Sequence, residues 1–99
     1  MVKKSLTSQY TLLTLTHAIT KAIEELGWNI VEQSPNKIQI TTPPSFFSWG
    51  ETIEIFIKGQ SKGTHISIIS EPNIQLFDWG KSEDNVNLLL NVLSSVLDE

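Results

Sequence analysis

Two tryptophan–glycine motifs are the parts of this chain best suited to binding chemistry. Phe47-Ser48-Trp49-Gly50 precedes Glu51, and Phe77-Asp78-Trp79-Gly80 precedes Lys81. A tryptophan ring is costly to leave in water and its face attracts cations, while glycine allows turns that bulkier residues cannot make. The paired motifs predict one shared aromatic construction, which is either a structural plug or a binding surface.

Catalytic constellations are missing from the sequence. His17 is expected within a helix and His65 near the start of the last strand, so we do not expect the two rings to meet. Neither histidine has a metal-binding spacing, cysteine is absent, and there is no glycine-rich phosphate loop. The adjacent carboxylates Glu24 and Glu25 point apart on a helix. The sequence therefore predicts a protein that is not an enzyme and binds neither metal nor cofactor.

Composition predicts a single α+β domain that covers residues 1–99. The chain is 39% hydrophobic and 18% charged, which is ordinary for a globular protein. Its formal net charge is −4, and none of its seven basic residues is an arginine. Nucleic acid and anionic membranes are therefore unexpected partners. No apolar segment of sufficient length follows Met1, so we expect a cytoplasmic protein.

Hydrophobic periodicity predicts the element order β-α-β-β-β-β-α. Strands are expected at 2–7, 28–33, 38–42, 52–58 and 64–70, with a hairpin loop at 59–63. A first helix is expected over 9–26, with Ser8 as its N-cap and Gly27 as its C-cap. A second helix opens at Ser82, and its apolar stripe ends at Leu97.

These elements predict a two-layer sandwich with a mainly antiparallel sheet. Two one-sided helices and a sheet with one apolar face can bury each other only by stacking, so both helices should cover the same face. The last four strands should form a meander, and the first strand most simply pairs antiparallel with the last.

In that topology the aromatic residues gather at one end. Three junctions share this end: Gly27-Trp28, the segment 43–50 and the segment 71–80. The predicted structural or binding cluster comprises Trp28, Phe46, Phe47, Trp49, Phe77, Asp78, Trp79 and Lys81. Acidic residues surround it, namely Glu24, Glu25, Glu51, Glu71, Asp78, Glu83 and Asp84. This rim is either simply solvated, or it favours a neutral or cationic ligand or a basic segment of a protein partner.

The uncovered face of the sheet offers a second candidate surface. Val31, Phe56 and Ile69 are its apolar residues, and Phe56 and Ile69 can be cross-strand neighbours. Together they form a candidate dimer face, because homodimers are common among soluble proteins.

The two motifs also carry a family resemblance. Residues 46–51, then Asp78-Trp79-Gly80-Lys81 and Asn85-Val86, resemble a family of small uncharacterised prokaryotic α+β domains, although Ser82 stands where that family usually has asparagine. The resemblance supports the strand order and implies no activity. The expected architecture is also similar to helix-grip and TATA-binding-protein-like layers, some of which hold apolar ligands between helix and sheet. The function expected is therefore a non-enzymatic binding or interaction module; the alternative is a carrier of a small apolar ligand.

Overall fold

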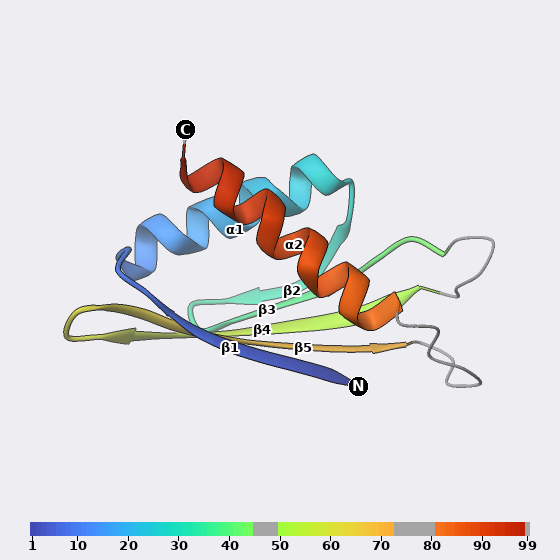
Figure 1. The fold of residues 1–99 in the computed structure, drawn as a ribbon, viewed down its shortest axis with the longest axis horizontal. Coiled ribbons are helices and arrows are strands. Elements are labelled where there is room, and N and C mark those ends of the chain that lie inside the picture. Colours follow the sequence, from blue (N-terminus) through green and yellow to red (C-terminus); the bar gives the residue numbers. More distant parts are fainter. Residues whose placement is uncertain (45–49, 73–80, 99) are drawn as a thin grey trace.

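The computed structural model describes residues 1–44, 50–72 and 81–98 of the chain. The element order is the predicted one (Figure 1). The elements are β1 (Val2–Ser8), α1 (Leu12–Leu26), β2 (Asn29–Ser34), β3 (Lys37–Thr41), β4 (Glu51–Gln60), β5 (Gly63–Pro72) and α2 (Lys81–Leu97).

The five strands form one sheet in the order β1-β5-β4-β3-β2, and every neighbouring pair is antiparallel. β1 lies beside β5, with Val2 opposite Ser70 and Ser8 opposite Thr64. Both helices cover the same face of the sheet (Figure 1). The predicted α+β two-layer sandwich is therefore confirmed.

Strand alternation divides the sheet into a covered face and an open face. In β4 the side chains of Ile53, Ile55 and Ile57 are buried, while Phe56 between them is exposed. Ile55 stands opposite an isoleucine on each side, Ile38 in β3 and Ile68 in β5. This row of isoleucines forms the sheet side of the hydrophobic core, because a period of two sends alternate residues to one face.

The helices supply the other half of the core. The buried side chains of α1 and α2 follow the helical repeat: Leu15, Ala18, Ile19, Ala22 and Ile23 in α1, and Val86, Leu89, Leu93 and Val96 in α2. Within the part of the chain that the structure describes, neither helix is long and apolar enough to cross a membrane.

The start of α1 differs from the prediction. Thr11, not Ser8, is the N-cap, and its hydroxyl accepts a hydrogen bond from the Thr14 N–H at 3.2 Å. Ser8 instead stays in the sheet opposite Thr64, and its hydroxyl accepts from the Tyr10 N–H at 3.0 Å. The strand pairing holds Ser8 in extended conformation, so the helix begins three residues later than expected.

Thr11→Ala is expected to lower the free energy of unfolding by about 1 kcal/mol, because the helix loses a cap acceptor for one of its free N–H groups. Thr11→Ser keeps the hydroxyl and should cost only a fraction of that. Urea denaturation followed by circular dichroism measures both variants. Equal losses in the two would show that the hydroxyl does not cap the helix.

Several other element boundaries also differ from the prediction by one or more residues. β4 and β5 extend to Gln60 and from Gly63, so their hairpin has a two-residue connection rather than the predicted loop 59–63. β2 spans 29–34 rather than 28–33, and its pairing with β3 shifts between Ile30 and Glu32. α2 already includes Lys81, one residue before the predicted capping residue Ser82.

Candidate functional site

Four buried polar side chains gather at one end of the molecule. Thr42 follows β3, Glu51 begins β4, Ser70 lies near the end of β5, and Asn85 lies in the second turn of α2. These ends of the elements meet on the same side of the structure (Figure 1). Each of the four residues is at most 6% exposed. We call Thr42, Glu51, Ser70 and Asn85 the buried polar cluster.

The sequence contained a signal for this cluster that the prediction missed. Glu51 is in phase with the buried isoleucines of β4, beginning with Ile53, and Ser70 is in phase with Ile68 in β5. Asn85 precedes the buried Leu89 by four residues, which places both on one helix face. Glu51 was predicted to belong to the acidic rim around the aromatic end, whether solvated or binding. Its actual burial follows from the strand period, which turns it toward the helices.

Thr42 and Glu51 hold the start of β4 against the end of β3. The Glu51 N–H donates to Thr42 Oγ1 at 2.9 Å, and the Thr42 N–H donates to the Glu51 carbonyl at 3.0 Å. Gly50, just before Glu51, has a φ of 92°, a left-handed conformation that favours glycine. The alternation of β4, which begins directly after Gly50, directs the Glu51 side chain into the protein.

Ser70 has a hydroxyl that folding alone does not explain. Its Oγ is fully buried and has no hydrogen-bond partner among the described residues. It stands between Val2 and Ile53 on the covered face, and Glu51 is the next residue of β4 on that face. A buried hydroxyl without a partner costs about 1–3 kcal/mol, so such groups call for an explanation.

The start of α2, which carries Asn85, lies on the same side of the molecule as the end of β5, which carries Ser70 (Figure 1). Lys4 in β1 donates from Nζ to Asn87 Oδ1 at 2.6 Å, and Lys4 is opposite Ile68 in the sheet. Asn85 lies two residues closer to the helix start, about 3 Å along the axis.

The cluster contains a carboxylate, an amide and two hydroxyls, and among them the Ser70 hydroxyl is the group without a hydrogen-bond partner among the described residues. Exposed acidic side chains occur nearby, at Glu71 in β5 and at Glu83 and Asp84 in the first turn of α2. Over the described residues, no group of three or more histidine, cysteine, aspartate or glutamate side chains is arranged to hold a metal ion.

The predicted aromatic cluster is only partly within the described structure. Trp28 is half-buried and packs against the hydrophobic core. Lys81 begins α2, but its side chain lies outside the described part, as do these residues of the predicted site: Phe46, Phe47, Trp49, Phe77, Asp78 and Trp79. Of the strand residues that flank these junctions, Asn29 at the start of β2 is opposite Thr41 at the end of β3, and Glu51 at the start of β4 is opposite Pro72 at the end of β5. The aromatic cluster itself stays a prediction.

The candidate dimer face lies on the open side of the sheet. Val31 is 60% exposed and Phe56 is 40% exposed, while Ile69 is half-buried. Phe56 is opposite Ser67 and Ile69 is opposite Glu54, so Phe56 and Ile69 are diagonal neighbours. Val31 falls at the irregularity of the β2–β3 pairing, apart from the other two.

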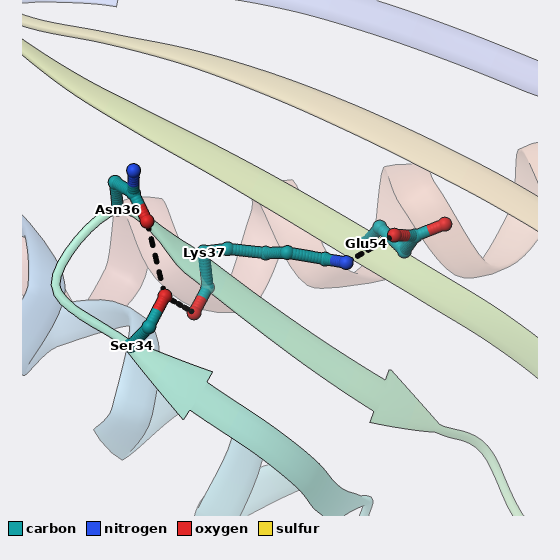
Figure 2. Close-up of polar contacts among 4 residues, drawn as sticks. All are labelled: Ser34, Asn36, Lys37 and Glu54. Carbon is teal, nitrogen blue, oxygen red and sulfur yellow. Dashed lines mark hydrogen bonds and ion pairs between the residues drawn. The ribbon is translucent and has the colours of Figure 1, made fainter.

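Polar contacts surround Phe56 on this face. Lys37 Nζ lies 2.9 Å from Glu54 Oε2 (Figure 2). The same nitrogen lies 5.5 Å from the centre of the Phe56 ring. The hydrogen bond that Lys37 donates to the Glu54 carboxylate raises the pKa of Lys37. Because Lys37 is already fully charged at neutral pH, this change affects stability only in strongly alkaline solution, where the contribution is lost as the amine deprotonates.

Comparisons with known proteins identify the fold but no family. No family model matches the chain, and no curated protein matches it. The solved structure of protein MLL2253 from Mesorhizobium loti is similar over 98% of this chain and 96% of its own, with a TM-score of 0.71 and 14% sequence identity. Ara h 8.0201 is similar over 99% of this chain and 97% of its own, with a TM-score of 0.59 and 10% identity. At such low identity these likenesses show that the chain shares its α+β fold with these proteins, and nothing about its ligand.

Proposed function

We propose that this protein is a non-enzymatic binding module and that the buried polar cluster belongs to its ligand site. The single observation that carries the proposal is the Ser70 hydroxyl, which is buried without a hydrogen-bond partner among the described residues. Asn85 and Glu51 place an amide and a carboxylate at the same end. A ligand that accepts or donates hydrogen bonds there would satisfy the hydroxyl and recover its desolvation cost.

The charges at this end favour a neutral or cationic ligand. The cluster contains a carboxylate and no basic group, and the neighbouring Glu83 and Asp84 are exposed. Lys4, the cation on the covered side of β1, is engaged with Asn87. An anionic ligand would meet repulsion here, since the whole chain carries a net charge of −4. A basic segment of a protein partner fits this end, whereas nucleic acid does not.

Ser70→Ala is expected to leave the free energy of unfolding unchanged within about 0.5 kcal/mol, or to raise it, because no hydrogen bond is lost. Ser67→Ala in the same strand is the matched control. The Ser67 hydroxyl lies 3.1 Å from the Ser5 hydroxyl across the open face, so its removal should cost about 0.5–1 kcal/mol. Urea denaturation measures both. A loss above about 1.5 kcal/mol in Ser70→Ala would give the hydroxyl a structural role and remove the basis of the proposal.

The same Ser70→Ala variant tests binding. Amide chemical shifts are followed by NMR while a tetralysine peptide, neutral 1-naphthol or a short DNA duplex is added. We expect saturable shifts at Ser70 and Asn85 with the peptide or the naphthol, and at least tenfold weaker binding in Ser70→Ala with Ser67→Ala unchanged. Saturable shifts at these residues with DNA, or equal affinity in both variants, would contradict the proposal.

A carrier of a small apolar ligand is the second candidate function. Its support is a groove of about 240 Å³ between β1 and α2, lined mainly by apolar side chains: Leu6, Tyr10, Leu90, Leu93, Ser94, Leu97 and Asp98. Against an enclosed ligand stands the packed core, where Ile53 and Leu89 are at most 1% exposed. The titration with 1-naphthol separates the two candidates, because a carrier would show its saturable shifts at Leu90 and Leu97 rather than at Ser70.

A further inference from the structure

A second concave surface lies on the open face of the sheet. This groove has a volume of about 450 Å³, within the range of small-molecule sites. It lies over β4 and β5 beside the turn between β2 and β3, and its lining residues are Asn36, Phe56, Ile57, Lys58, His65 and Ser67. The helices cover the opposite side of the sheet, so the groove is separate from the buried polar cluster (Figure 1).

Basic groups are the only ionisable side chains that line this groove. Lys58 and His65 stand directly opposite each other in the β4–β5 pair, and no carboxylate is among the lining residues. His65 Nδ1 lies 3.1 Å from the Thr7 hydroxyl, which fixes the ring from β1 and leaves Nε2 for a ligand. Two basic side chains side by side repel each other when both are charged, and an anion between them removes that repulsion.

One neutral lining residue, Asn36, can act as a hydrogen-bond donor. The Ser34 hydroxyl donates to Asn36 Oδ1 at 3.0 Å, a shorter contact than its 3.4 Å approach to the Lys37 carbonyl. Figure 2 shows the Asn36 amide nitrogen pointing away from Ser34. The side-chain oxygen of Asn36 is thus already hydrogen-bonded, so Asn36 can offer a ligand its side-chain N–H groups. Glu54, on the same face of β4, is held by Lys37 at 2.9 Å.

Phe56 gives the groove an aromatic wall. Its ring is 40% exposed although it lies in the middle of the sheet, and Lys37 Nζ approaches it to 5.5 Å. An aromatic ring with an exposed face stacks favourably on a planar ligand. The donors and cations beside it complement a negative charge at one edge of such a ligand.

We propose that this groove binds a small aromatic carboxylate, with its ring against Phe56 and its carboxylate between Lys58 and His65. The site goes beyond the binding function proposed above, because it lies on the other face of the sheet and selects the opposite charge. Either site can therefore fail in experiment without affecting the other.

Titration with benzoate, followed by NMR on the full chain, tests this site. Saturable shifts are expected at Phe56, Lys58 and His65, with benzamide binding at least fivefold more weakly because it lacks the charge. Lys58→Gln should weaken benzoate binding about fivefold, the effect of one exposed ion pair. Lys3→Gln is the control: Lys3 is exposed on the same face, opposite Ile69, and does not line the groove.

Both variants are exposed lysines, so their folding should be unchanged, and circular dichroism checks this. Equal affinities for benzoate and benzamide would overturn the proposal, as would an equal loss in Lys3→Gln and Lys58→Gln. Absence of saturable shifts in the groove at millimolar benzoate would also overturn it.

Discussion

Gly63→Ala is expected to lower the free energy of unfolding by about 3–4 kcal/mol, the largest loss we predict from a single methyl group. Gly63 has a φ of 112°, which L-residues rarely adopt. A Cβ at this position would lie 2.0 Å from the Ser8 carbonyl oxygen, which belongs to the backbone and cannot turn aside. Strain and steric overlap therefore add, and urea denaturation measures their sum.

Two other glycines separate these causes. Gly27 has a φ of 73° but open space around its would-be Cβ, so Gly27→Ala should cost about 1 kcal/mol, from conformation alone. Gly59 has open space and no positive φ, so Gly59→Ala should change stability little. If Gly63→Ala costs no more than Gly27→Ala, the close approach of β5 to the end of β1 is wrong.

The pairing of β1 with β5 also explains why one cap of α1 could be predicted from the sequence and the other could not. Gly27 was predicted as the C-cap of the first helix, and its left-handed conformation and its N–H bond to the Glu24 carbonyl at 3.1 Å confirm it. This signal is local. The N-cap was misplaced because Ser8 and Thr11 are equally good hydroxyls by local criteria. The pairing of Ser8 with Thr64, 56 residues along the chain, decides between them.

In the candidate site, too, local sequence patterns predict one property and tertiary packing determines another. The strand and helix periods predict that Glu51, Ser70 and Asn85 are buried, because each is in phase with a buried apolar residue. Whether a buried hydroxyl has a hydrogen-bond partner depends on which polar groups of the other strands and of α2 lie next to it. No local sequence pattern carries that information. Periodicity thus predicts which positions are buried. Tertiary packing decides which polar groups among them stay without a partner, and those are the groups that suggest a ligand.

Ile68→Ala should lower the free energy of unfolding by about 3–4 kcal/mol, whereas Ile69→Ala in the next position should cost about 1 kcal/mol. Ile68 is 1% exposed on the covered face, opposite Ile55, and its loss leaves a cavity beneath the helices. Ile69 is half-buried on the open face, where water can fill the space. The two variants remove the same atoms from adjacent residues of β5. The difference between their losses in free energy of unfolding therefore measures the contribution of packing against the helix layer. Urea denaturation gives both values, and equal losses at low protein concentration would contradict the two-layer arrangement.

The same pair tests the homodimer predicted from Val31, Phe56 and Ile69. Stability of a dimer rises with protein concentration, while stability of a monomer does not. If the open face pairs with a second copy, the cost of Ile69→Ala should grow as concentration is raised, and sedimentation should show the variant dissociating first. The cost of Ile68→Ala relative to the native chain should stay constant in either case. Val31 is separate from the Phe56–Ile69 pair, and the Lys37–Glu54 ion pair lies beside Phe56. A stable dimer would have to cover roughly 800 Å² on each copy, and three apolar side chains divided by such pairs supply only a small part of that area.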